Sequence, residues 1–105
     1  MAVITSTDND FDDVIEQNEK VVIKYFADWC GSCKLFAPKY KRLSEDDQYN
    51  GITFLEVNAE ENEFARRKSG VNNLPFFSIF KDGELVEGVA TSKEEVVVDL
   101  INKLN

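Results

Sequence analysis

The sequence contains no histidine and only two cysteines among its 105 residues. A structural zinc site or an iron–sulfur cluster usually takes four cysteine or histidine ligands. A metal site in this protein would therefore need a second subunit or several carboxylates to complete it. We expect no metal and no other resident cofactor.

Apolar runs of membrane-spanning length are also absent, and residues 1–8 have neither the basic nor the apolar segment of a secretory signal peptide. These features predict a cytoplasmic protein. The 20 acidic and 12 basic residues give a net charge of −8, which disfavours nucleic acid and anionic membranes as partners. No linker or repeat interrupts the sequence, so we expect residues 1–105 to form one domain.

Both cysteines lie in one short motif, W-C-G-S-C-K, at residues 29–34. A disulfide between Cys30 and Cys33 would close a very short loop and, as a structural staple, would stabilise little. If a helix starts at or just after Cys30, unpaired N–H groups and the helix dipole favour a thiolate there. Cys33 would then lie one turn along, within reach. The spacing therefore favours a disulfide that opens and closes.

Strands and helices are expected to alternate along the first two thirds of the sequence. Runs of β-branched and aromatic residues predict two central strands, at residues 21–27 and 52–57. Apolar residues at helical spacing predict three helices, at residues 8–17, 33–47 and 60–69. Pro38 is expected to kink the second helix, and Gly70 to cap the third.

The last third predicts a hairpin followed by a helix. Residues 76–80 and 84–89 have strand character and flank an Asp-Gly turn, which is a strong signal for an antiparallel pair. Ser92 and Glu95 are spaced as a capping box that would open a terminal helix. With a short edge strand at residues 2–5, these elements predict a mixed, helix-flanked α/β sheet.

The sequence resembles the thioredoxin family over nearly its whole length. The matching features are W-C-G-x-C-K, Pro38, the Leu74-Pro75 pair and F-K-D-G at residues 80–83. The resemblance implies the thioredoxin fold, with a central mixed sheet of four or five strands flanked by four helices. It also implies reduction of protein disulfides by dithiol–disulfide exchange, with disulfide-containing client proteins and a thioredoxin-reductase-like electron donor as partners.

The resemblance also implies a role for each cysteine. Cys30 resembles an exposed attacking thiolate that forms a mixed disulfide with the client protein. Cys33 resembles the buried resolving thiol that then displaces the reduced product.

A substrate groove is implied beside the cysteines. Trp29 resembles a flat apolar platform there, although the sequence also allows an ordinary core tryptophan. Pro75 resembles a cis-proline that faces the cysteines, and Ala90 stands where the family usually has glycine. The residues expected to contact substrate are Trp29, Gly31, Ser32, Leu74, Pro75 and Ala90.

Two departures from the family pattern lie close to these residues. Ser32 replaces the usual proline between the cysteines, which frees a backbone N–H and is expected to shift the redox balance away from the strongest reductants. Phe76 follows Pro75 where the family commonly has threonine, and it is expected to add apolar bulk beside the site.

A third departure is a reversed pair of charges. Lys24 stands where the family keeps a buried aspartate, and Glu56 stands where many members have lysine. Buried charges are costly unless paired, so we expect these two side chains to form an ion pair. One hypothesis is that Glu56 assists deprotonation of Cys33 through water while Lys24 holds it in place. The alternative is a pair that only neutralises two semi-buried charges.

Three other functions remain open at the level of sequence. A binding module of this fold would not use its thiols, and a glutaredoxin-like enzyme would use glutathione. An oxidase or isomerase would need an oxidising compartment.

Overall fold

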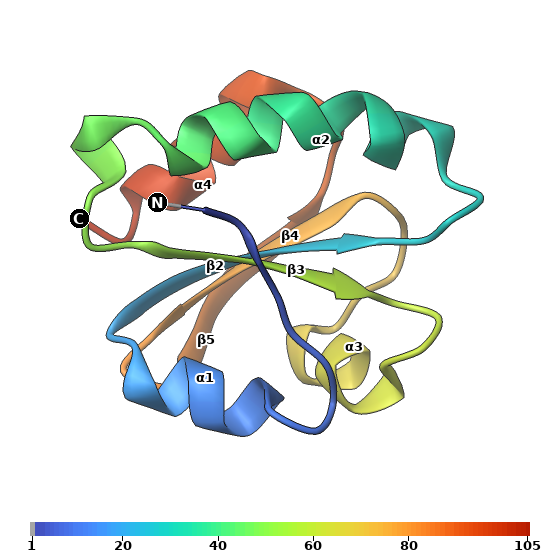
Figure 1. The fold of residues 1–105 in the computed structure, drawn as a ribbon, viewed down its shortest axis with the longest axis horizontal. Coiled ribbons are helices and arrows are strands. Elements are labelled where there is room, and N and C mark those ends of the chain that lie inside the picture. Colours follow the sequence, from blue (N-terminus) through green and yellow to red (C-terminus); the bar gives the residue numbers. More distant parts are fainter. Residues whose placement is uncertain (1) are drawn as a thin grey trace.

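Five strands form one mixed sheet in residues 2–105, which the computed structural model describes (Figure 1). The strand order is β1-β3-β2-β4-β5. β3 pairs in parallel with β1 and β2, whereas β4 is antiparallel to β2 and β5. The strands are β1 (Ile4–Thr5), β2 (Lys20–Phe26), β3 (Thr53–Asn58), β4 (Phe76–Lys81) and β5 (Glu84–Ala90). This arrangement confirms the mixed sheet, the edge strand and the antiparallel hairpin.

Helices cover both faces of the sheet. Figure 1 shows α2 and α4 on one face and α1 and α3 on the other. The helices are α1 (Phe11–Gln17), α2 (Gly31–Ser44), α3 (Glu63–Ser69) and α4 (Glu94–Asn102), with a short 3₁₀ turn, η1 (Asp47–Tyr49). Because β2 and β3 are covered on both faces, most of their side chains can be apolar, as the sequence pattern predicted.

α2 is fixed on the sheet by aromatic side chains at helical spacing. The ring of Phe36 lies 5.0 Å from that of Phe77, and Tyr40 lies 5.4 Å from Phe54. The buried Tyr40 hydroxyl also donates to the carbonyls of Val22 at 3.1 Å and Leu55 at 2.8 Å, one on each central strand. These contacts set the height and direction of the helix that carries the cysteines.

The starts of α1 and α3 differ from those expected because polar side chains form turns there instead. α3 begins at Glu63, not residue 60, since the Asn58 side chain accepts the Glu60 N–H at 3.0 Å and shapes a preceding turn. Asp8, expected inside α1, instead accepts the N–H groups of Phe64 and Ala65 in the first turn of α3. Helix α1 therefore starts later, at Phe11.

The remaining helix signals have mixed outcomes. The prediction of a capping box at Ser92 and Glu95 is wrong, because α4 begins at Glu94 and its N-cap residue is Lys93. The Thr91 hydroxyl accepts the Lys93 N–H at 3.0 Å and forms a turn just before the helix. α2 starts at Gly31, two residues before the expected position, and contains Pro38 in its interior. The expected C-cap is confirmed, since Gly70 ends α3 with a φ of 69°.

Phe76 lies in the core and not beside the cysteines, so the expectation of added bulk at the site is wrong. Side chains alternate along a strand, and Phe76 shares the face of β4 that also carries Ser78 and Phe80. Its ring meets Tyr25 edge-on at 6.2 Å in the core beneath α1 and α3. It also covers Gly88 of the neighbouring strand β5, where an added Cβ would lie 2.7 Å from a ring carbon.

We predict that Gly88→Ala destabilises the fold by about 1–3 kcal/mol, because the new methyl group would overpack against the buried Phe76 ring. Urea denaturation of the variant measures this loss. In a Phe76→Thr background the same substitution should cost less than about 1 kcal/mol, since the ring is gone. Equal costs in the two backgrounds would contradict this account of Gly88.

Candidate active site

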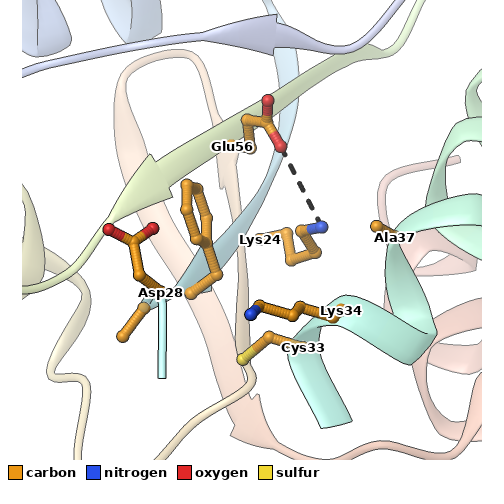
Figure 2. Close-up of a pocket in the computed structure, with 8 residues that line it drawn as sticks. Lys24, Asp28, Cys33, Lys34, Ala37 and Glu56 are labelled. Atoms are coloured by element: carbon orange, nitrogen blue, oxygen red, sulfur yellow. Dashed lines mark ion pairs between the residues drawn. The ribbon is translucent and has the colours of Figure 1, made fainter. Parts of the chain in front are cut away.

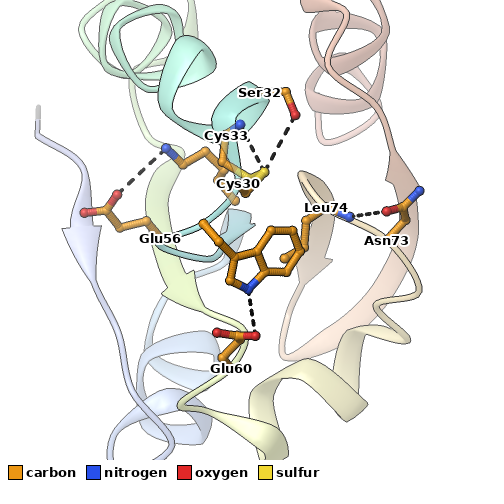
Figure 3. Close-up of a disulfide and its surroundings, with 9 residues drawn as sticks. Cys30, Ser32, Cys33, Glu56, Glu60, Asn73 and Leu74 are labelled. Atoms are coloured by element: carbon orange, nitrogen blue, oxygen red, sulfur yellow. Dashed lines mark hydrogen bonds and ion pairs between the residues drawn. A yellow bond between two sulfur atoms is a disulfide. The ribbon is translucent and has the colours of Figure 1, made fainter.

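The two cysteines form a disulfide at the start of α2 (Figure 3). Cys30 is the N-cap residue with an extended backbone, and Cys33 lies in the first helical turn. Their Cα atoms are 5.3 Å apart, and the Cys33 N–H donates to the Cys30 sulfur at 3.2 Å. A helix that starts just after Cys30, on which the thiolate argument depended, and a bonded pair of cysteines are both present. The cap also supplies a backbone donor to any charge that develops on Cys30.

Both cysteines are buried in this disulfide form, with 4% of Cys30 and 2% of Cys33 exposed. The expected exposure of Cys30 is therefore wrong for the oxidised protein. Ala27 and Leu74 pack against the pair and cover it. The two sulfurs differ in their surroundings more than in their burial. Ser32 Oγ lies 3.6 Å from the Cys30 sulfur, whereas Cys33 faces a pocket that also contains Lys24.

Trp29 stands at the surface beside the disulfide, with 67% of the residue exposed. The alternative of a core tryptophan is excluded. Its indole N–H donates to the Glu60 carboxylate at 2.7 Å, which fixes the direction of the ring (Figure 3). Sequence reasoning missed Glu60, because its partner lies 31 positions away and no local pattern connects them.

The peptide bond between Leu74 and Pro75 is cis, as the resemblance implied. Leu74 packs against the cysteine cluster, so this loop lies at the disulfide. A hollow of about 210 Å³ runs from Ser32 past Leu74 and Pro75 to Ala90. A second hollow, of about 270 Å³, lies between Trp29 and Leu74. Apart from Gly31, which is exposed at the helix start, the expected groove residues line these two hollows.

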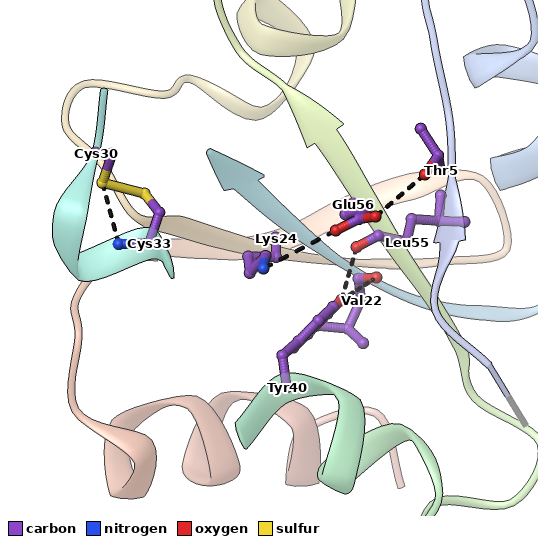
Figure 4. A network of polar contacts seen from close by, with 8 residues as sticks. All are labelled: Thr5, Val22, Lys24, Cys30, Cys33, Tyr40, Leu55 and Glu56. Carbon is purple, nitrogen blue, oxygen red and sulfur yellow. Dashed lines mark hydrogen bonds and ion pairs between the residues drawn. A yellow bond between two sulfur atoms is a disulfide. The ribbon is translucent and has the colours of Figure 1, made fainter. Parts of the chain in front are cut away.

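Lys24 and Glu56 lie opposite each other on the parallel strands β2 and β3. Their Nζ and Oε2 atoms are 3.9 Å apart, and the side chains are 4% and 31% exposed (Figure 4). Thr5 of β1 donates to the other Glu56 oxygen at 3.1 Å. The expected ion pair is confirmed. Burial lowers the pKa of Lys24 below its ordinary value of 10.5, and the charge of Glu56 opposes this change.

The ion pair and the Cys33 side chain share one pocket of about 200 Å³ (Figure 2). Asp28, Lys34 and Ala37 line the same pocket, and the Lys24 ammonium also lies 5.4 Å from the centre of the Tyr40 ring. Aromatic faces attract a cation, which helps to keep Lys24 charged. Lys34 and Asp28 were not assigned a role from the sequence, because only the folded loop brings them to this pocket.

Residues 2–103 match the family model described as Thioredoxin. The sequence is 32% identical over 103 residues to thioredoxin 1 of Plasmodium falciparum, an alignment that covers 98% of this chain and 97% of that protein. The chain belongs to the thioredoxin family. It is a thiol–disulfide oxidoreductase, since this family reduces protein disulfides and the Cys30–Cys33 pair is present.

Solved thioredoxins share the whole architecture. Thioredoxin f from spinach chloroplasts superposes with a TM-score of 0.90 at 28% identity, covering 98% of this chain and 93% of that chain. A chain from the crystal structure of a ferredoxin:thioredoxin reductase and thioredoxin f2 complex gives 0.89 at 30% identity, covering 97% and 94%. Among residues 2–105, no helix is long and apolar enough to cross a membrane. The same residues contain no cluster of three or more metal-ligating side chains.

We predict that Glu56→Gln destabilises the fold by about 1–3 kcal/mol at neutral pH, because it leaves the Lys24 ammonium buried and unpaired. This loss of stability is smaller than the loss expected on breaking a fully buried ion pair, because water reaches Glu56. With its pKa lowered in the fold, Lys24 loses its proton at a lower pH than in the unfolded chain, so the loss of stability relative to the unsubstituted protein should shrink as the pH approaches 10.5.

Urea denaturation between neutral and alkaline pH measures both effects. Adding Lys24→Met to Glu56→Gln removes the buried charge, so the double variant should recover most of the lost stability. If the stability loss of the double variant equals the sum of the losses of the two single variants, the Lys24 charge does not need Glu56 as its partner.

Proposed function

We propose that Cys30 is the nucleophile and Cys33 the resolving thiol in the reduction of client disulfides. The Cys30 thiolate attacks one client sulfur, forms a mixed disulfide and releases the other client sulfur as a thiolate. The Cys33 thiolate then attacks the Cys30 sulfur, re-forms the Cys30–Cys33 disulfide and releases the second client thiolate. Two electrons thereby pass to the client. The observation that carries this proposal is the place of Cys30 as N-cap of α2, where its sulfur accepts a backbone N–H.

The client segment is proposed to lie across the two hollows beside the disulfide. Trp29 offers an exposed flat ring on one side, while Leu74, Pro75 and Ala90 form the other side with Ser32. Gly31 leaves open space above the helix start, which allows a client chain to approach Cys30. Apolar contact with the ring and the loop would hold the client sulfur in line for attack.

Glu56 is proposed to accept the proton of Cys33 through water, with Lys24 holding the carboxylate in place. The shared pocket supports this, because it is large enough for water and is lined by both side chains and by Cys33. The partial exposure of Glu56 gives the proton a path to solvent.

The partners are proposed to be disulfide-containing proteins and a thioredoxin-reductase-like donor. Each turnover leaves the protein oxidised, so a dithiol must reduce Cys30–Cys33 before the next client binds. The similarity to a chain from a reductase complex supports this kind of donor. A reductase also needs a compartment that keeps thiols reduced, so we propose the cytoplasm. The continuous sheet from β1 to β5 supports one domain over residues 1–105.

The division of labour between the thiols can be tested by the reduction of insulin disulfides. Cys30→Ser should abolish the activity, because no nucleophile remains at the helix N-terminus. Cys33→Ser should also stop turnover, but it should accumulate a mixed disulfide with insulin through Cys30, visible by mass spectrometry. A trapped complex that forms through Cys33 in the Cys30→Ser protein would reverse the assignment.

The proton-transfer role of Glu56 can be tested by the rate at which the mixed disulfide resolves. We expect Glu56→Gln to slow this step about 10- to 100-fold near pH 7, within the usual contribution of a positioned base. The slowing should diminish as the pH rises and the Cys33 thiol ionises without help. Glu61→Gln, which removes the same charge from an exposed turn, is the control. An unchanged resolution rate from pH 6 to 8 would leave the ion pair with a structural role only.

A further inference from the structure

Ser32 places a hydroxyl beside the reactive sulfur, at a position where the family usually has proline. Its Oγ lies 3.6 Å from the Cys30 sulfur, a distance suited to the large sulfur atom, and the link is drawn in Figure 3. The same sulfur accepts the Cys33 N–H at 3.2 Å. Two donors therefore converge on Cys30, one from the backbone and one from a side chain.

The position of Ser32 in the helix explains this contact. It is the second residue of α2, so its side chain stands on the exposed first turn, next to the N-cap residue Cys30. It also lines the hollow formed with Leu74, Pro75 and Ala90. Ser32 thus lies next to both the reactive sulfur and the hollow proposed for the client.

We propose that Ser32 is a catalytic residue in its own right, whose hydroxyl donates a hydrogen bond to the Cys30 thiolate. This role rests on the proposed function of Cys30 as nucleophile. A hydrogen bond to an ionised sulfur is stronger than one to a neutral sulfur, which is only a weak acceptor. The contact therefore stabilises the reduced, ionised protein more than the disulfide or the mixed disulfide.

Two consequences follow from this difference. The pKa of the Cys30 thiol is lower than it would be without the hydroxyl, so more of the protein carries a thiolate near pH 7. The equilibrium between dithiol and disulfide also shifts toward the dithiol, since the hydrogen bond is stronger in the reduced, ionised form than in the disulfide. Ser32 thereby makes the protein readier to attack and less strongly reducing.

Substitution of Ser32 alters none of the other charges around Cys30. Asp28 precedes it in the loop, and Lys34 follows in α2. Glu60 reaches the site through the Trp29 indole. From β2 and β3, Lys24 and Glu56 face the pocket on the Cys33 side. An effect of Ser32→Ala therefore reports on the hydroxyl.

The test measures the pH dependence of Cys30 alkylation by iodoacetamide in a Cys33→Ser background, where Cys30 is the single thiol. Ser32→Ala should raise the Cys30 pKa by about 0.5 to 1 unit, the amount expected for one hydrogen bond to a charged group with partial access to water. Ser32→Thr keeps the hydroxyl and should retain the original value. Ser92→Ala, which removes another hydroxyl from the same hollow, should leave it unchanged.

In the protein with both cysteines, Ser32→Ala should shift the equilibrium with glutathione about 3- to 10-fold toward the disulfide, the same difference in free energy read as an equilibrium constant. An unchanged Cys30 pKa in Ser32→Ala, or equal shifts in Ser32→Ala and Ser32→Thr, would overturn the proposal. Those results would leave the proposed function intact if the unsubstituted protein reduces insulin. Failure of the unsubstituted protein in that assay would instead refute the proposed function itself.

Discussion

The first turn of α2 is the constraint on which the rest of the site depends. It must hold Cys30 at the cap and Cys33 in the helix, so that one backbone N–H points at the reactive sulfur. Hydrogen-bond donors at a helix start favour a negative charge, and here the charge can only be a thiolate. Phe36 and Tyr40 hold this helix on the face of the sheet by packing against its strands. The cis loop at Leu74 then closes over the pair from the other side.

A second constraint acts beneath the cysteines. The parallel register of β2 and β3 places Lys24 beside Glu56, within the pocket that reaches Cys33. A buried ammonium is tolerated there because it has a carboxylate partner and lies over the rings of Phe26 and Tyr40. The site therefore combines a hydroxyl and a backbone donor at one sulfur with a reversed ion pair behind the other.

Most of the fold and the centre of the site could be predicted from local patterns. The strands, the Asp-Gly hairpin and the Gly70 cap depend on neighbouring residues, and the Lys24–Glu56 pair follows once the two strands are taken as parallel neighbours. Two of the failures, those at Asp8 and Cys30, involve partners distant in sequence. Asp8 caps α3 from another part of the chain. The position of Phe76 depends on strand alternation, and the burial of Cys30 depends on the Leu74 loop.

The most direct test of the account is the equilibrium of the Cys30–Cys33 pair in glutathione buffers, followed by intact mass after acid quenching. The account predicts only two species, the disulfide and the dithiol, which interconvert in a single two-electron transition with a slope of about 30 mV per tenfold change. The same protein should reduce insulin with electrons from a dithiol donor. Accumulation of a stable adduct between glutathione and Cys30 would contradict the account and indicate a glutathione-dependent enzyme.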